Sequence, residues 1–259
     1  MTSPDSTERF SSRVADYVRY RPDYPAALMD WLHGPMAVAT DALVADIGAG
    51  TGISSRQFLA AGHPLVAVEP NAAMRAAAEQ WLAPQYPQYP QFSAVDGRAE
   101  ATGLADASVD LVSAAQAFHW FDTVAVRAEW QRILRPGGLA LIYWNSRLLD
   151  ASPFLVGYEQ LLLDYGTDYT AVAERYQDDA TMQAWFGSGL RGMVQLPNVQ
   201  HLDLDALRGR LLSSSYAPQP GHPRHAPMLA ALQDLFAAHA VDGLVAFEYR
   251  TRAFLGTLD

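Results

Sequence analysis

Short apolar runs alternate with segments of helical spacing along the first 145 residues of the chain. Each run is a compact stretch bounded by turn-forming residues, which is typical of a buried strand. Buried strands that alternate with helices predict a doubly wound α/β fold with a mostly parallel sheet. The apolar runs are 43–47, 65–68, 92–95, 109–114 and 139–144.

Capping residues mark the helices between these strands. We expect helices over 54–61, over 72–81 with Asn71 as its N-cap, and over 123–134 with Asp122 as its N-cap, because a side-chain oxygen at this position satisfies a free backbone amide. The last of these helices has four apolar residues on one face: Val126, Trp130, Ile133 and Leu134.

The first strand runs into three glycines at alternate positions, Gly48, Gly50 and Gly52. Glycine tolerates positive φ and has no Cβ, so this turn lets the backbone approach a ligand closely. A dinucleotide fingerprint requires a third small residue five positions after the first glycine. The residue at that position here is Ile53, which is not small. The second strand ends in Glu69, whose carboxylate can accept hydrogen bonds from both hydroxyls of a ribose. These features favour a ribose-containing ligand over a pyrophosphate.

Four motifs, taken in order, closely resemble those of the class I S-adenosylmethionine-dependent methyltransferases. More narrowly, the chain is similar to the type 11 group, which includes ubiquinone/menaquinone and trans-aconitate methyltransferases. The resemblance covers roughly residues 10–145. It implies a seven-stranded, Rossmann-like sheet with an antiparallel last strand and a helical cap after strand five. The motifs are 46–52, 68–71 with Met74, 97–100 and 135–138.

The resemblance implies S-adenosylmethionine as the cofactor and S-adenosylhomocysteine as its product. The glycine turn and Thr51 would hold the methionine portion, Glu69 the ribose, and Met74 with Ala99 the adenine. Met74 could equally fill the core. The cofactor-binding residues that we expect are Tyr17, Arg21, Asp46, Gly48, Ala49, Gly50, Thr51, Glu69, Pro70, Met74, Arg98, Ala99, Glu100, Gln116 and Ala117.

Two of these assignments have alternatives. The aromatic and Arg-rich stretch 10–25 would form a lid in which Tyr17, Tyr20 or Arg21 reaches the methionine carboxylate, or else an ordinary N-terminal helix. In the family the residue at position 98 is often acidic and accepts a hydrogen bond from the adenine amino group. Arg98 cannot accept one. We therefore expect the Ala99 amide and the carboxylate of Asp96 or Glu100 to contact the adenine in its place.

The heptad 115–121 follows strand four and should lie beside the transferable methyl group, because ligands of open α/β sheets bind beyond the carboxyl ends of the strands. Its His119 has an unperturbed pKa that suits a general base, although it could instead have a positioning role beside Trp120. Tyr20, His119 and Trp120 are the catalytic candidates. The expected acceptor pocket contains Tyr17, Tyr20, Phe118, His119, Trp120 and Tyr216, while Trp144 could face either a substrate or the core.

We expect a single methyltransferase domain over 1–259. Its parts would be an N-terminal lid with helices, a cofactor-binding core, a helical substrate-cap region that contains strand six, and a final strand. The final strand is indicated by the alternation of apolar and charged residues over 245–252. The corresponding ranges are 1–40, 41–148, 150–240 and 241–259.

Composition narrows the possible partners. The net charge of −10 disfavours nucleic acid, and the absence of cysteine excludes disulfides, thiolate metal sites and a Cys nucleophile. His222 and His225 lie in a polar loop without further ligands nearby, so no metal is expected. No signal peptide or membrane span is visible. We expect a cytoplasmic monomer or homodimer with a small-molecule substrate and no membrane partner.

The sequence therefore predicts methyl transfer from S-adenosylmethionine to a small acceptor that is apolar, aromatic or carboxylate-bearing. The acceptor atom, whether O, N or C, depends on pocket shape and is not encoded in the donor motifs. One alternative is a module that binds the cofactor without transferring methyl. Another is a nicotinamide-dependent dehydrogenase, against which Ile53 argues. The acidic charge weakens a further alternative, methylation of a macromolecule.

Overall fold

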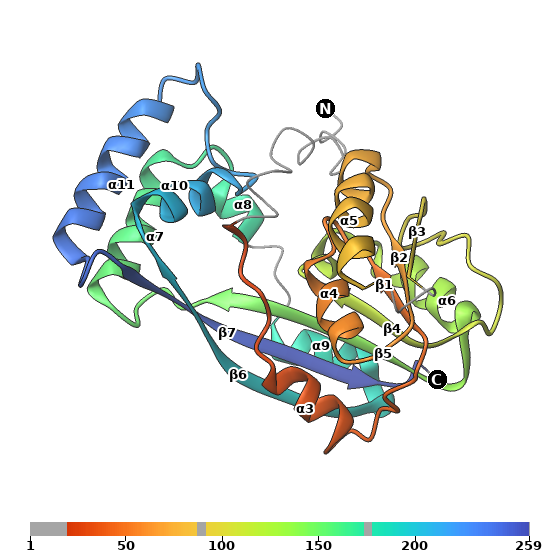
Figure 1. Ribbon diagram of the computed structural model, residues 1–259. Coiled ribbons are helices and arrows are strands. Elements are labelled where there is room, and N and C mark those ends of the chain that lie inside the picture. The colour runs from red at the N-terminus through yellow and green to blue at the C-terminus, as the bar shows by residue number, and fades with distance from the viewer. Residues whose placement is uncertain (1–19, 87–91, 174–177, 259) are drawn as a thin grey trace.

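The computed structural model describes residues 20–86, 92–173 and 178–258 (Figure 1). Within these ranges seven strands form one sheet in the order β3-β2-β1-β4-β5-β7-β6. There β7 pairs antiparallel with both β5 and β6, and the other pairs of strands are parallel, which confirms the expected fold class. The strands are β1 (Val44–Ile47), β2 (Leu65–Val68), β3 (Ser93–Val95), β4 (Val109–Ala115), β5 (Leu134–Arg147), β6 (Leu190–Leu202) and β7 (Val245–Gly256).

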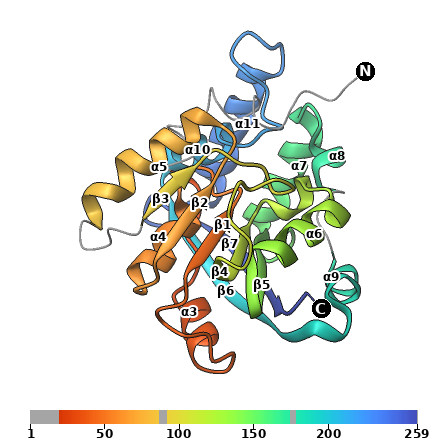
Figure 2. The ribbon, with the colours of Figure 1, turned by 90° about the vertical axis from the view of Figure 1, so that its right-hand side faces the viewer.

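Helices cover both faces of the sheet (Figure 2). α3 (Ala27–His33), α4 (Ile53–Ala60) and α5 (Ala72–Gln85) lie on one face, and α6 (Thr123–Ile133) and α9 (Asp179–Phe186) lie on the other. Neighbouring residues of a strand point to opposite faces, so the buried strand residues divide between two hydrophobic clusters, one beneath each helical layer. Within the described ranges, no helix has the length and apolar character that crossing a membrane requires.

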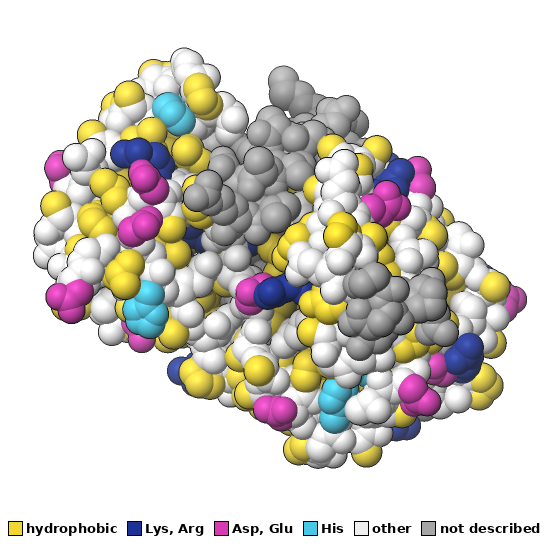
Figure 3. All heavy atoms as spheres, viewed as in Figure 1, with side chains coloured by type: hydrophobic (Ala, Val, Ile, Leu, Met, Phe, Trp, Pro, Cys, Tyr) yellow, Lys and Arg dark blue, Asp and Glu magenta, His cyan; other side chains and the backbone are white. Residues whose placement is uncertain are grey.

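A second lobe stands at one end of the sheet, on the left in Figure 1. β5, β6 and β7 extend into it, and Phe247 and Tyr249 of β7 pack there in a third hydrophobic cluster. In the view of Figure 3, hydrophobic, acidic and basic side chains are interspersed over both lobes. The helices of the second lobe are α7 (Pro153–Tyr165), α8 (Tyr169–Ala173), α10 (Leu204–Leu212) and α11 (His225–His239).

Two strands are longer than the sequence indicated. β5 was expected over 139–144 but spans Leu134–Arg147. The turn at residues 136–138 (Pro-Gly-Gly) does not end the strand, because a register shift in the pairing with β4 accommodates it. Val109 pairs with Leu134, and two residues later Leu111 pairs with Leu139. β7 likewise continues beyond residue 252 to Gly256, where its pairing with β5 ends.

The two predicted helix caps are confirmed. Asn71 and Asp122 each accept hydrogen bonds from two backbone amides at the start of α5 and α6. The Trp144 side chain faces the core, where its ring centroid lies 6.3 Å from that of Phe118 and 6.2 Å from that of Phe254. α9 lies within the segment expected to form the cap, but its Met182 packs on the core sheet.

Asp46, the third residue of β1, joins this strand to α4. Its carboxylate is fully buried, and Oδ2 accepts hydrogen bonds from the hydroxyls of Ser54 (2.6 Å) and Ser55 (2.7 Å). Burial raises the pKa of Asp46 to about 6, although the bonds from the two serines act in the opposite direction. These contacts fix the start of α4 relative to the glycine turn.

We predict that Asp46 makes the protein less stable as the pH rises. The folded state holds the proton up to about pH 6 and the unfolded state only to about pH 4, so the native state binds more protons between these values. The free energy of unfolding should therefore fall by about 1 kcal/mol more between pH 5 and pH 8 in the wild type than in Asp46→Asn. Urea denaturation of both proteins across this range measures the difference, and parallel pH profiles would contradict the prediction.

Candidate functional site

A cleft opens beyond the carboxyl ends of β1, β2, β3 and β4. Chain order in the sheet reverses between β1 and β4, and such a switch point is where open α/β sheets bind ligands. The main part of the cleft is lined by Gly48, Gly50, Glu69, Pro70, Asn71, Met74, Arg98, Ala99, Glu100, Ala115, Gln116, Ala117, Trp120 and Phe121.

An adjoining pocket extends the cleft toward the N-terminal segment. It shares Gly48, Gly50, Ala115 and Gln116 with the main part. Arg21 lines this pocket and also donates from Nη2 to the carbonyl of Ser213, 3.0 Å away, so it links the pocket to the second lobe. The remaining lining residues are Pro22, Tyr24, Ala49, Ile53 and Ser54.

The three glycines of the turn have different roles. All have positive φ, at 68° for Gly48, 57° for Gly50 and 86° for Gly52. A Cβ on Gly48 would lie 2.8 Å from that of Ala117, and one on Gly52 would lie 2.7 Å from Leu82 Cδ1. On Gly50 the nearest atom would be the Met74 sulfur at 3.8 Å. Gly48 and Gly52 are therefore needed for packing, whereas Gly50 keeps the cleft open.

Glu69 presents a buried carboxylate to the cleft. Oε2 accepts a hydrogen bond from the Gly50 amide (2.9 Å), and Oε1 accepts one from the Asn71 amide (2.8 Å). Each carboxylate oxygen has a second lone pair, so both can still accept a bond from a ligand. Burial raises the pKa of Glu69, although the two amides and Arg75 act in the opposite direction.

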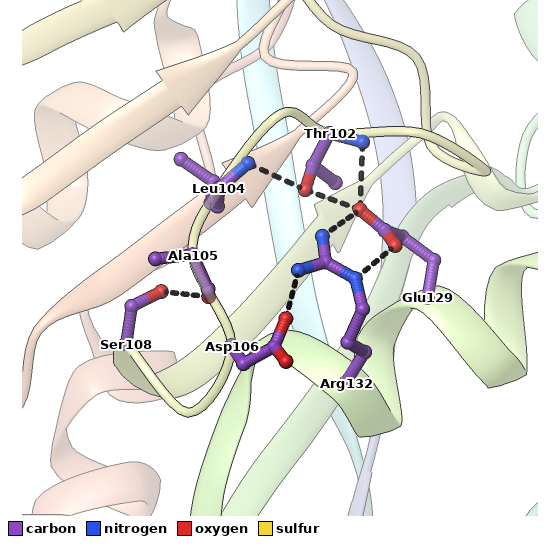
Figure 4. Close-up of polar contacts among 7 residues, drawn as sticks. All are labelled: Thr102, Leu104, Ala105, Asp106, Ser108, Glu129 and Arg132. Atoms are coloured by element: carbon purple, nitrogen blue, oxygen red, sulfur yellow. Dashed lines mark hydrogen bonds and ion pairs between the residues drawn. The ribbon is translucent and has the colours of Figure 1, made fainter.

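The loop after β3 brings Arg98, Ala99 and Glu100 to the cleft, and Glu129 of α6 anchors the end of this loop (Figure 4). Glu129 Oε1 accepts bonds from the Thr102 amide (2.8 Å) and hydroxyl (2.6 Å). The figure also draws contacts of Leu104, Ala105 and Ser108 in the same loop.

Arg132 completes this anchor. Its guanidinium binds both oxygens of Glu129 and also pairs with Asp106 (2.5 Å). Hydrogen bonds from Arg132, and then from Thr102, lower the pKa of Glu129 to about 2. Arg132 lies in the last turn of α6, and through these contacts it holds the adjacent loop against this helix.

Gln116 occupies a strained position at the end of β4. Its φ is 54°, a left-handed conformation that is uncommon outside glycine, and such strain is concentrated at functional sites. Its backbone amide donates to the carbonyl of Tyr143 and its Nε2 donates to that of Asn145, both at 3.0 Å. These bonds hold its side chain between the two parts of the cleft.

Most of the residues expected to bind a cofactor line this cleft, but some expected residues lie elsewhere. Asp46 and Thr51 are buried and belong to neither lining. His119 lies in η1 (Phe118–Trp120), where its ring centroid is 4.9 Å from that of Trp120, and it does not line the described cleft. The Tyr20 ring packs against Gly209 of α10. Tyr17 lies outside the described residues.

Phe118 corrects the expected acceptor pocket. It is 1% exposed, and its ring centroid lies 4.9 Å from that of Trp185 and 6.0 Å from that of Trp130. Phe118 therefore belongs to the core. Phe121, three residues later in the same heptad, was not among the residues named for the acceptor pocket, and it lines the cleft. Phe121 directly follows η1, and side chains three residues apart in a 3₁₀ turn point to the same side, so the spacing carries no signal that these two side chains differ in exposure.

Comparison with known proteins identifies a family. A family model described as a methyltransferase domain matches residues 45–142. An uncharacterized methyltransferase of Mycobacterium tuberculosis is 39% identical over 143 residues, which cover 55% of this chain and 54% of that protein. The chain thus spans about half the length of the mycobacterial relatives that it matches. A putative methyltransferase of Dictyostelium discoideum is 30% identical over 210 residues, which cover 76% of this chain and 75% of that protein.

Solved structures show the same fold. A putative type II methyltransferase from Anaeromyxobacter dehalogenans superposes with a TM-score of 0.66 at 23% identity, over 92% of this chain and 98% of that one. A methyltransferase from Geobacter sulfurreducens in complex with S-adenosylhomocysteine gives 0.55 at 15% identity, over 96% and 98%. This chain therefore belongs to the methyltransferase family, in the type 11 group that its motifs indicated, and has the fold of the class I S-adenosylmethionine-dependent enzymes.

Proposed function

We propose that this protein transfers a methyl group from S-adenosylmethionine to a small-molecule acceptor. The observation that carries the proposal is the Glu69 carboxylate, buried at the end of β2 and held beside the glycine turn by the Gly50 amide. A carboxylate fixed in this position suits the two hydroxyls of a ribose. Family membership favours methyl transfer over the nicotinamide-dehydrogenase and binding-only alternatives.

The cleft residues fit the parts of the donor. The backbone at Gly48 and Gly50 and the guanidinium of Arg21 would hold the methionine portion, because an arginine matches a carboxylate geometrically. Met74 lines the cleft and would cover one face of the adenine. Pro70, next to Glu69, would extend the apolar wall beside the sugar.

The adenine amino group would be recognised by Glu100 or by the Ala99 amide. Both residues line the cleft, whereas Asp96 is not among the lining residues and pairs with Arg75 at 3.5 Å. Glu100 also accepts a bond from the Asp122 amide (3.0 Å), which limits its movement. Glu100 or the Ala99 amide would thus take the role of the acidic residue that the family often has at the position of Arg98.

Bound S-adenosylmethionine supplies a methyl group that its positive sulfur makes electrophilic. The protein then has to align the acceptor with this methyl group and exclude water, and proximity alone accounts for much of the rate. Gln116 and Trp120 lie where the cleft would open to the acceptor. The helices of the second lobe, which all lie within the proposed cap region 150–240, would cover it. His119 stays the candidate for accepting a proton from the acceptor.

We predict that Glu69→Gln weakens binding of S-adenosylhomocysteine roughly 10- to 100-fold, because hydrogen bonds to a charged group contribute about 1.5–3 kcal/mol. Wild-type affinity should also fall as the pH is lowered from 7.5 toward 5, since the raised pKa of Glu69 favours its neutral form, and the variant should lose this dependence. Isothermal titration calorimetry measures both effects. Glu79→Gln, at an exposed position of α5, is the matched control. Equal affinity of the Glu69 variant and the wild type would contradict the prediction.

Alanine substitutions at Gly50 and Gly52 should separate binding from folding. Both force alanine into a left-handed conformation that costs about 1–2 kcal/mol, but only Gly52→Ala also clashes with Leu82. We expect Gly50→Ala to lose most donor affinity with a small loss of thermal stability. Gly52→Ala should lose more stability. Thermal denaturation and donor titration test this, and a Gly50 variant that binds normally would disprove the assignment.

Incubation with methyl-labelled donor and a panel of quinols, carboxylic acids and phenols should identify an acceptor. If His119 removes a proton, His119→Gln should lower kcat about 10²- to 10⁴-fold with little change in the donor KM. An unchanged kcat would leave His119 with a positioning role only. The proposed function would fail if the donor bound but no class of acceptor was methylated.

A further inference from the structure

The second lobe buries two arginines that the donor cleft does not use. Arg147 is the last residue of β5, and its side chain is 10% exposed. Arg210 lies on α10 and is 6% exposed. Buried charges in proteins are normally paired, because an isolated charge away from water is strongly destabilising.

Arg147 is only partly satisfied. Its Nη2 donates to the Glu159 carboxylate and to the Tyr169 hydroxyl (2.8 Å), and its guanidinium lies 5.3 Å from the centre of the Tyr158 ring. Its Nη1 is buried without a hydrogen-bond partner in the described part of the chain, and so is the Tyr158 hydroxyl. Two donors in this cluster therefore lack an acceptor.

Arg210 binds neutral groups. Its Nε donates to the Tyr249 hydroxyl (3.0 Å) and its Nη1 donates to the Ser214 hydroxyl (3.2 Å). The guanidinium carbon lies 5.4 Å from the centre of the Phe247 ring. Over residues 20–86, 92–173 and 178–258, Arg210 forms no ion pair with a carboxylate.

The cluster therefore has an excess of positive charge. Burial opposes the charged form of both arginines, but the surrounding tyrosines, together with Glu159 beside Arg147, outweigh it, so the pKa values of Arg147 and Arg210 are raised. Both guanidinium groups stay protonated. Glu159 is the one carboxylate bonded to either of them among the described residues, so two positive charges face one negative charge.

Tyr216 is a partly exposed residue beside this cluster. It lies close enough to influence the pKa values of Arg147, Arg210 and Tyr158, although burial is the largest influence on each. Its ring centroid is 5.0 Å from that of Tyr169. Its hydroxyl forms none of the hydrogen bonds found among the described residues. A ligand that reached Tyr216 would meet three donors without acceptors.

Two connections link this cluster to the donor cleft. Gln116, which lines the cleft, donates to the carbonyl of Asn145, and Arg147 is two residues further along β5, about 7 Å at the rise of a strand. The second connection begins with Gln200, which accepts from the Tyr249 hydroxyl (2.8 Å) that Arg210 contacts. Gln200 also donates to the carbonyl of Tyr20 (3.2 Å), the residue before Arg21, which lines the adjoining pocket. β5, which ends at Arg147, enters the second lobe (Figure 1).

We propose that Arg147 and Arg210 form an anion-binding subsite, so that the acceptor carries a carboxylate or phosphate group. This inference rests on the proposed function, because it assigns the acceptor side of the same site. A guanidinium fork matches either oxyanion geometrically. The anion would neutralise the excess charge and supply the acceptor atoms that Arg147, Tyr158 and Tyr216 lack, while the aromatic rings would contact the rest of the molecule.

The test measures binding of benzoate, phenyl phosphate and neutral benzamide by isothermal titration, with and without excess S-adenosylhomocysteine. We expect at least one of the two anions to bind the wild type about tenfold or more tightly than benzamide, and the tighter anion tells a carboxylate from a phosphate site. Arg210→Met should abolish this preference and leave the affinity for S-adenosylhomocysteine unchanged. Arg208→Met, on the same helix and paired with Asp205 near the surface, is the matched control.

A double variant, Arg147→Met with Glu159→Gln, removes the other guanidinium without leaving an unpaired carboxylate. It should also abolish the preference, which keeps the test informative if Arg210→Met does not fold. Equal binding of anions and amide by the wild type, no binding of either anion, or a preference that survives in a folded variant would overturn the proposal. Failure of the wild type to bind S-adenosylhomocysteine would count against the proposed function alone, because anion binding is also measured without it.

Discussion

The hydrogen bond from the Gly50 amide to the Glu69 carboxylate is the interaction on which the proposed donor site depends. It joins the ends of two adjacent parallel strands, and it can form only if the turn after β1 adopts the positive φ values of three glycines. Asp46 fixes the helix that follows this turn through Ser54 and Ser55. Asp46, within β1, thus holds the backbone after the turn, and Glu69, after the end of β2, presents its carboxylate to the cleft.

The same sheet also joins the donor cleft to the second lobe. β5 and β7 leave the core as a long antiparallel pair, and Arg147 at the end of β5 pairs with Tyr249 of β7. A strand that passes from one lobe into the other fixes the distance between their sites more firmly than a flexible linker would. In this arrangement, an acceptor held by its charged end in the second lobe would present its other end to the methyl group.

Local signals predicted much of the fold and most of the residues that line the cleft. The apolar runs, the caps at Asn71 and Asp122 and the glycine turn each depend on neighbouring residues, so they can be recognised in the sequence. The length of β5 could not be predicted, because the register shift opposite Leu111 depends on a partner strand. Phe118 was assigned to the pocket because adjacent residues of a short helical turn can face either the core or the cleft. The burial of Arg210 could not be predicted, because no sequence motif marks it and the burial of a charge depends on the tertiary structure.

The most direct test of the donor site is a crystal structure of the protein with S-adenosylhomocysteine. We predict that both ribose hydroxyls donate to the Glu69 carboxylate, that the adenine lies against Met74 and Ala99, and that the amino-acid end lies by Gly48 and Arg21. An empty cleft after soaking at saturating concentration would contradict the account. A ligand bound with its ribose away from Glu69 would contradict it equally.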